Sequence, residues 1–218
     1  MASILTKEQA LFLKLMPETP LAKQFYFSGG TALAYYYLQH RRSQDLDFFC
    51  QEEFLPQEIT TILKFLQKKL GFKKLDFQTS FNRNLYFLIF NPKKILKVEF
   101  TYFPFSQIEK PLLKDGLLVD SLLDIAVNKL FTIAQSPRGR DYFDLYFIIR
   151  KHQYSLDRLR LLAKRKFDWH IDPLQLASKL NQVDKHLDDP ILTNQIDGSL
   201  ISGFFKNQAK ALKNEIIA

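Results

Sequence analysis

Residues 25–49 have the sequence FYFSGGTALAYYYLQHRRSQDLDFF, and our expectation for the fold rests on this segment. The aromatic run 25–27 is typical of a short buried strand, and the apolar segment 32–38 has helical character. The connection between them consists of four small residues, Ser28, Gly29, Gly30 and Thr31. Asp45 and Asp47 then open a second strand, on which residues two apart project from the same face. The stretch therefore predicts a strand, a tight turn, a helix and a strand that carries two carboxylates.

The segments on either side extend this unit into a sheet followed by helices. A helix is predicted over 6–16 and another over 56–70, which ends at Gly71. Aromatic and branched residues predict an antiparallel meander over 72–81, 84–90 and 95–103, with a short strand at 116–119. After residue 120 the pattern is helical, over 122–134, 141–151, 156–166, 173–187 and 200–217. We therefore expect an α+β chain with two domains, a mixed sheet with flanking helices over 1–120 and an all-helical domain over 121–218.

The composition is that of a globular protein with a basic surface. The 218 residues are 46% hydrophobic and 25% charged, which excludes a largely disordered chain. The formal charge of +8 favours polyanionic partners such as nucleic acid or nucleotides, although it also simply aids solubility. The single cysteine, Cys50, excludes an intramolecular disulfide and a cysteine-rich zinc site. With no secretory signal and no apolar run of ~18 residues, we expect a cytoplasmic protein that does not enter the membrane.

The glycine pair and the aspartate pair are the first candidates for chemistry. A helix that begins at two glycines directs free backbone amides outward and attracts phosphate, although an ordinary capped turn is the simpler interpretation. Asp45 and Asp47 on one face of a strand would bind divalent cations together with a triphosphate. The alternative for this pair is a solvent-facing edge strand.

Glu99 is the candidate for a third carboxylate. It lies in an otherwise apolar strand, in the sequence KVEFT at 97–101, where it would share a face with Lys97 and Thr101. The alternative is a surface ion pair between Lys97 and Glu99, which contributes little to stability.

Taken together, these motifs resemble the signature of the AbiEii/AbiGii toxin family, which belongs to the polymerase-beta-like nucleotidyltransferase superfamily. The resemblance lies in residues 29–34, 40–43 and 45–49, and it implies that superfamily's mixed sheet. A second block, Lys129 followed by RDYFDLY at 140–146, is similar to the family's Lys and Arg-Asp-x-x-Asp-Leu motifs. The resemblance covers approximately residues 25–150.

The second block implies further residues of the nucleotide site. By resemblance, Lys129, Arg140 and Asp141 complete that site beside the residues of the glycine turn, Ser28, Gly29, Gly30 and Thr31. For Asp144 we favour a structural role, as a partner of Arg138 or Arg140.

The resemblance implies transfer of a nucleoside monophosphate from an NTP to an acceptor hydroxyl. Magnesium ions (Mg²⁺) would be held by Asp45, Asp47 and Glu99, and Glu99 would orient or deprotonate the hydroxyl. Family members that extend the acceptor end of transfer RNA favour RNA, specifically the tRNA 3′ end, as the acceptor. The family also implies a growth-arresting toxin with a separately encoded antitoxin.

A basic segment in the helical half is the candidate RNA-binding surface. Its cationic residues include Arg158, Arg160, Lys164 and Arg165. These residues match an RNA backbone, although a solvated basic helix face explains them equally well. Two alternatives remain for the function: attachment of a nucleotide to a protein Ser, Thr or Tyr (AMPylation), and a non-catalytic module that binds nucleotide or RNA.

Overall fold

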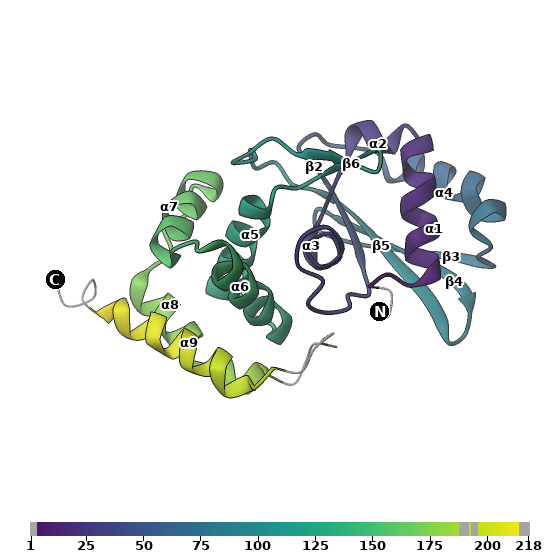
Figure 1. Cartoon of the computed structure of the whole chain (residues 1–218). Coiled ribbons are helices and arrows are strands. Elements are labelled where there is room, and N and C mark those ends of the chain that lie inside the picture. The colour runs from purple at the N-terminus through teal and green to yellow at the C-terminus, as the bar shows by residue number, and fades with distance from the viewer. Residues whose placement is uncertain (1–3, 188–191, 193–195, 214–218) are drawn as a thin grey trace. The chain divides into compact units, whose positions relative to one another are not determined.

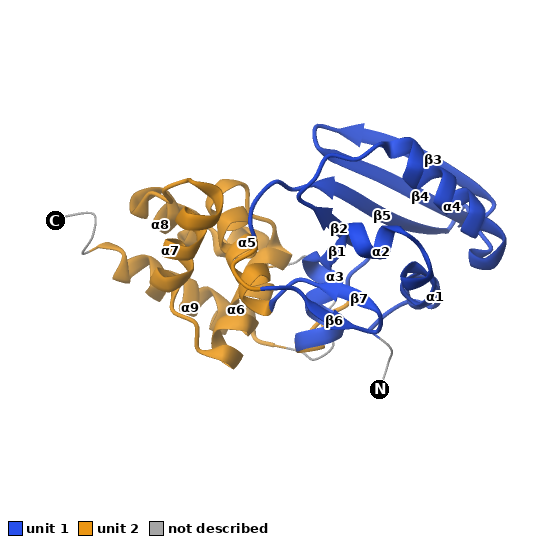
Figure 2. Ribbon diagram, turned by 90° about the horizontal axis from the view of Figure 1, so that it is seen from above, with its two compact units in different colours: residues 1–37, 43–106, 110–121 blue, residues 38–42, 107–109, 122–218 orange. Residues whose placement is uncertain are grey.

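The computed structural model describes residues 4–187, 192 and 196–213, which form two compact units (Figure 2). The sheet unit comprises residues 1–37, 43–106 and 110–121, and the helical unit comprises 38–42, 107–109 and 122–218. The domain boundary predicted at residue 120 lies beside the last of these divisions. The short segments 38–42 and 107–109, predicted to lie in the first domain, instead belong to the helical unit.

A seven-stranded mixed sheet is the framework of the sheet unit (Figure 1). Its strands are β1 (Tyr26–Ser28), β2 (Leu46–Cys50), β3 (Lys74–Ser80), β4 (Arg83–Asn91), β5 (Lys94–Tyr102), β6 (Leu112–Lys114) and β7 (Leu117–Val119). The order across the sheet is β3-β4-β5-β2-β1-β7-β6. The pairs β2–β5 and β1–β7 are parallel, and the other neighbours are antiparallel. The predicted α+β class and the predicted meander over β3, β4 and β5 are confirmed.

The helices of the sheet unit begin and end where local chemistry dictates. They are α1 (Lys7–Leu15), the 3₁₀ turn η1 (Met16–Glu18), α2 (Leu21–Gln24), α3 (Gly29–Leu33), the π-helical turn η2 (Ala34–Leu38) and α4 (Pro56–Leu70). Thr6 and Gln9 cap the start of α1 reciprocally, each side chain accepting from the other's backbone amide. Gly71 ends α4 in the left-handed conformation, with φ +82°.

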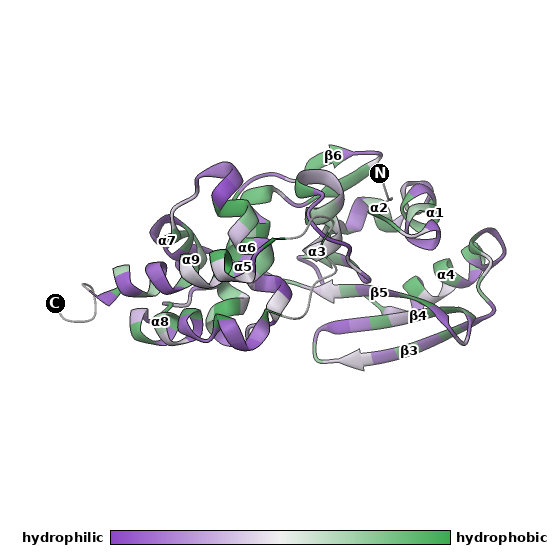
Figure 3. Ribbon diagram, turned by 60° about the horizontal axis from the view of Figure 1, so that its bottom comes forward, coloured by the Kyte–Doolittle hydropathy of each residue, from purple (hydrophilic) through white to green (hydrophobic). Residues whose placement is uncertain are grey.

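One face of the sheet is buried beneath α1 and α4. The Phe12 ring of α1 packs on Phe48 of β2 at 6.0 Å between centroids, and the Tyr86 hydroxyl of β4 donates to the Pro56 carbonyl of α4. Alternate residues of β2 project to the opposite face, where Asp47 is only half-buried. Figure 3 shows that both hydrophobic and hydrophilic residues occur along β4 and β5. The carboxylates of interest therefore lie on the face away from this core.

Five α-helices form the described part of the helical unit. They are α5 (Leu122–Gln135), α6 (Gly139–His152), α7 (Leu156–Phe167), α8 (Pro173–Asn181) and α9 (Gly198–Ala211), with the 3₁₀ turn η3 (Val183–His186) after α8. The buried Asp124 of α5 binds the Lys166 ammonium of α7 at 2.7 Å and accepts from the amides of Ile108 and Glu109. These hydrogen bonds explain why segment 107–109 belongs to the helical unit.

The structure differs from some of the predicted elements. The helix predicted from residue 32 begins at Gly29, because the glycine pair forms its first turn. Strand β6 was not predicted, since three residues are too few to show a period. The last part of the helix predicted to reach residue 217 lies outside the described residues. None of the helices in the described part of the chain combines the length and the apolar character needed to cross a bilayer.

Candidate active site

The turn from β1 into α3 brings the backbone of Gly29 against the Asp47 carboxylate. Ser28 and Asp47 are register partners on the antiparallel strands β1 and β2, so the next residue, Gly29, begins α3 beside that carboxylate. Gly29 has φ +72°, and a Cβ atom added there would lie 2.2 Å from Asp47 Oδ2. Glycine is therefore required for both its backbone angle and its lack of a side chain.

The two hydroxyl residues of the turn hold it in place from within. Ser28 Oγ donates to Asp120 Oδ2 at 2.8 Å, and Thr31 Oγ1 donates to the Asp45 carbonyl. Both side chains are buried. Their hydroxyls thus bind the protein itself, while the first amides of a helix lack intrahelical partners and are suited to an anion.

Two of the three predicted carboxylates lie on the neighbouring parallel strands β2 and β5, and the third directly precedes β2. Asp47 of β2 and Glu99 of β5 are register partners, so their side chains project side by side from the same face. Asp45 precedes β2 by one residue and lies two residues before Asp47, on the same face. The structure therefore brings together the three acids that the sequence singled out.

Two cationic side chains contact this cluster of carboxylates. Arg83 of β4 donates from Nε and a terminal nitrogen to the two Glu99 oxygens, each at 2.6 Å. Lys97 of β5 lies 3.0 Å from Asp45 Oδ2 and 3.7 Å from Glu99 Oε2. Burial opposes ionisation of Glu99, but the hydrogen bonds and charge of Arg83 outweigh it and lower the pKa of that carboxyl. Glu99 is thus ionised at neutral pH.

The donor set suits a hard divalent cation. Carboxylate oxygens are the ligands that magnesium prefers, and the Lys97 ammonium between Asp45 and Glu99 marks a position where positive charge is favoured. With the side chains as they lie, no group of three or more His, Cys, Asp or Glu in the described ranges is arranged to hold a metal. The residues fit the cation chemically, and its ligands would be Asp45, Asp47 and Glu99.

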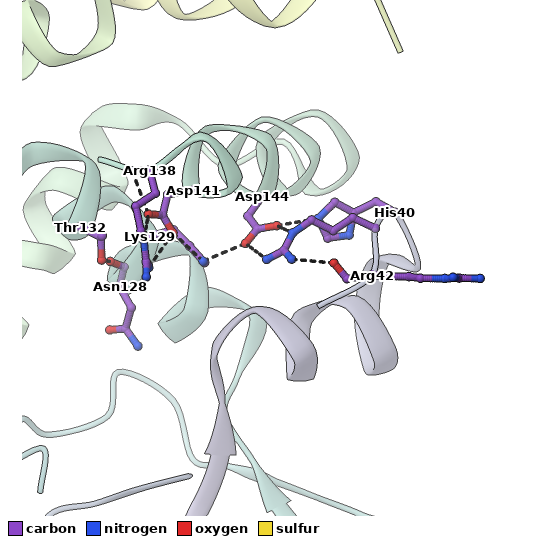
Figure 4. A network of polar contacts seen from close by, with 9 residues as sticks. His40, Arg42, Asn128, Lys129, Thr132, Arg138, Asp141 and Asp144 are labelled. Carbon is purple, nitrogen blue, oxygen red and sulfur yellow. Dashed lines mark hydrogen bonds and ion pairs between the residues drawn. The ribbon is translucent and has the colours of Figure 1, made fainter. Parts of the chain in front are cut away.

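A separate network in the helical unit is centred on Asp144 of α6 (Figure 4). The Asp144 carboxylate binds His40 Nε2 at 2.7 Å, Arg41 Nε at 2.6 Å and Lys129 Nζ at 2.8 Å. Burial raises the pKa of this carboxyl, but the charges of Lys129 and Arg41 outweigh it and hold the pKa well below its ordinary value. Asp144 thereby attaches segment 38–42 to α6.

Asp141, one turn before Asp144, shares Lys129 with it. Lys129 Nζ lies 2.7 Å from Asp141 Oδ1, and Arg138 Nε lies 3.0 Å from Asp141 Oδ2. Arg140 is half-buried in the first turn of α6. The prediction that Asp144 pairs with Arg138 or Arg140 is wrong, since Arg138 binds Asp141 and the partners of Asp144 are those given above. The role of Lys129, Arg140 and Asp141 in nucleotide binding stays a prediction from resemblance.

The basic helix α7 presents fewer exposed cations than its sequence suggests. Arg158, Lys164 and Arg165 are exposed. The Arg160 side chain is only 11% exposed, with a nitrogen 3.5 Å from Asp157, and Lys166 is fully buried against Asp124. The candidate RNA-binding surface therefore contains fewer cationic residues than the basic segment of the sequence.

Four residues contact the candidate site residues in ways that the sequence does not indicate. Arg83 and Lys97 contact the carboxylates, and His40 and Arg41 contact Asp144. The sequence indicates Lys97 only as a surface partner of Glu99. The basic cluster at 40–42 was a visible signal, but nothing local indicated that its partner lies 103 residues away.

The chain is similar in sequence to a family model and in fold to solved structures. Residues 11–212 match the family model described as "Nucleotidyl transferase AbiEii toxin, Type IV TA system". An uncharacterized protein of Aquifex aeolicus is 32% identical over 165 residues, which cover 75% of this chain and 76% of that protein.

Two solved structures share the fold. A Helicobacter pylori protein described as a nucleotidyltransferase has a TM-score of 0.62 at 20% identity, covering 96% of this chain and 93% of that chain. MenT4, a nucleotidyltransferase toxin of Mycobacterium tuberculosis, has a TM-score of 0.55 at 17% identity, covering 94% of this chain and 81% of that chain.

Proposed function

Because this chain belongs to the AbiEii nucleotidyl transferase toxin family, we propose that it transfers a nucleoside monophosphate from an NTP to an RNA hydroxyl. One observation carries the proposal. The register of β2 and β5 aligns Asp47 with Glu99, while Gly29 brings the start of α3 against the same Asp47 carboxylate. Acidic metal ligands beside free helix amides are what a metal–triphosphate complex requires.

Asp45, Asp47 and Glu99 are the proposed magnesium ligands. When bound, the cation neutralises the triphosphate and polarises its α-phosphate. The amides of Gly29 and Gly30 hold the phosphates, while the hydroxyls of Ser28 and Thr31 fix the turn that presents those amides.

Glu99 is the residue proposed to orient the acceptor hydroxyl. The acceptor hydroxyl oxygen bonds to the α-phosphorus, the bond from that phosphorus to the bridging oxygen breaks, and pyrophosphate leaves. The lowered pKa of Glu99 keeps it ionised, so it can accept a hydrogen bond from that hydroxyl and orient it, but it also makes Glu99 a weak base. The proton is therefore passed on to water.

RNA, and specifically the 3′ end of a transfer RNA, is the proposed acceptor. The formal charge of +8 and the exposed cations of α7 support a polyanionic partner. By family membership we further propose that the protein acts as a toxin in the cytoplasm and that a separately encoded antitoxin restrains it.

A transfer assay tests this proposal. The purified protein is incubated with Mg²⁺, each α-³²P-labelled NTP in turn and total RNA, beside an Asp45→Asn variant. We expect label on RNA from the parent protein only, and omission of Mg²⁺ to abolish it. Label on protein would instead identify a protein-modifying enzyme. Nucleotide binding without transfer from any NTP would identify a binding module, and either result would overturn the assignment.

A further inference from the structure

Lys97 occupies a position among the carboxylates that the family resemblance does not explain. Its ammonium lies 3.0 Å from Asp45 Oδ2 and 3.7 Å from Glu99 Oε2, between two of the three proposed metal ligands. The side chain is 24% exposed, so the charge is partly shielded from water. A cation at this place relieves the repulsion between carboxylates that share one sheet face.

Arg83 restrains the cluster from the other side. Its two hydrogen bonds to Glu99 engage both carboxylate oxygens, which is the bidentate geometry of a strong arginine–carboxylate pair. Thr101 Oγ1 donates a third hydrogen bond to Glu99, at 2.9 Å. Glu99 is therefore oriented by Arg83 and Thr101, and Lys97 is the more weakly attached of the two cations.

A divalent cation and the Lys97 ammonium compete for the same oxygens. A metal that binds Asp45 and Glu99 must approach to ~2.1 Å of each oxygen, which leaves no room for an ammonium group between them. The two positive charges would also repel each other at short range. One of them must leave before the other binds.

We propose that Lys97 is a built-in counter-cation of the carboxylate cluster, displaced from Asp45 and Glu99 when a divalent cation binds. This inference rests on the proposed function, because it takes the three carboxylates as metal ligands. Its consequence is that the nucleotide-free protein binds divalent cations weakly, and that the cation enters together with the triphosphate that it accompanies.

Binding of Mn²⁺ in the absence of nucleotide and acceptor tests the proposal. Electron paramagnetic resonance measures free Mn²⁺ directly and needs no turnover. We compare the parent protein with Lys97→Met, which keeps the apolar stem and removes the charge. Lys93→Met, in the exposed β4–β5 turn, is the control with the same change in net charge.

Removal of the competing charge is expected to tighten Mn²⁺ binding by about tenfold in Lys97→Met. The Lys93→Met variant is expected to match the parent. A misfolded protein would lose affinity, so a gain cannot come from structural damage. An unchanged or weaker affinity in Lys97→Met, an equal gain in Lys93→Met, or no Mn²⁺ binding by any variant would each overturn the proposal.

The transfer assay shows which of the two proposals has failed, the counter-cation role of Lys97 or the enzymatic activity. If Lys97→Met does not gain Mn²⁺ affinity while the parent transfers label to RNA, only the counter-cation role is wrong. If Mn²⁺ affinity rises in Lys97→Met but neither protein transfers label, the counter-cation role stands and the enzymatic assignment fails.

Discussion

At Gly29 a single hydrogen atom in place of a side chain determines the geometry of the candidate site. The residue combines φ +72° with a hypothetical Cβ position 2.2 Å from Asp47 Oδ2. Gly71 has a similar angle, φ +82°, but nothing lies within 4 Å of its Cβ position. Substitution at Gly71 therefore measures the cost of backbone strain alone, whereas substitution at Gly29 adds the cost of a steric clash.

We predict that Gly29→Ala destabilises the protein more than Gly71→Ala does. Strain at positive φ should lower the free energy of unfolding by ~1 kcal/mol in Gly71→Ala. The added clash with Asp47 should bring the loss to ~2–4 kcal/mol in Gly29→Ala and abolish transfer. Urea denaturation of both variants measures the difference in the free energy of unfolding. Equal losses would contradict the prediction, because they would show that contact with Asp47 adds no cost.

His40 is a second residue with a measurable signature. Its Nε2 binds Asp144, its Nδ1 has no hydrogen-bond partner among the described residues, and Arg41 and Lys129 add positive charge nearby. Burial, reinforced by these charges, lowers the pKa of His40 despite the neighbouring Asp144. The imidazole is therefore neutral in the folded protein at neutral pH.

We predict that the parent protein loses stability as the pH falls below ~6.5, the ordinary pKa of histidine. In that range the unfolded state binds a proton that the folded state does not. The free energy of unfolding should therefore fall by up to ~1.4 kcal/mol per pH unit until the folded pKa is reached. His40→Gln, which keeps a donor toward Asp144, should flatten this slope, while His170→Gln at an exposed site should retain it. An NMR titration that gives His40 a pKa above 6.5 would contradict the account.

Among the elements, α7 shows how burial divides a charge run into different roles. Lys166 stabilises the helical unit through Asp124, whereas Arg158, Lys164 and Arg165 are exposed to solvent. Only the exposed members can neutralise phosphate. If α7 binds RNA, these three exposed residues therefore make its phosphate contacts.

We predict that the triple substitution Arg158→Gln, Lys164→Gln and Arg165→Gln weakens RNA binding and its dependence on salt. For single-stranded RNA, each lost phosphate contact should reduce the slope of log affinity against log salt by ~0.7, or by ~2 in total. The control removes three exposed charges from α4, with Lys64→Gln, Lys68→Gln and Lys69→Gln. Filter binding at several salt concentrations compares them, and equal slopes in the two triple variants would place the RNA elsewhere.

Local sequence patterns predicted most of the helices and strands. They did not predict which residues of distant elements contact one another. In an extended segment, the two-residue spacing of Asp45 and Asp47 places both side chains on the same face. The contact of Arg83 with Glu99 depends instead on the register of β4 against β5, which no local pattern specifies. The contact of Asp144 with His40 joins residues 104 positions apart, and it was missed for the same reason.

For the whole molecule, the sequence indicated a sheet-bearing half and a helical half, and the structure has a unit of each kind. The predicted boundary followed chain order, so it could not show that segments 38–42 and 107–109 join the helical unit. Both segments are held by buried aspartates of that unit, Asp144 and Asp124. Buried charge, rather than the hydrophobic pattern, thus decides where these short segments belong.

Label transfer to RNA by Asp47→Asn tests whether these carboxylates form the active site. Asp76→Asn is the matched control, because Asp76 is a partly exposed carboxylate of β3 that pairs with Lys74. Loss of a metal ligand should reduce the single-turnover rate by at least about a hundredfold in Asp47→Asn. Circular dichroism should show both variants folded, and Asp76→Asn should transfer label at the parent's rate. Undiminished transfer by folded Asp47→Asn would contradict the account.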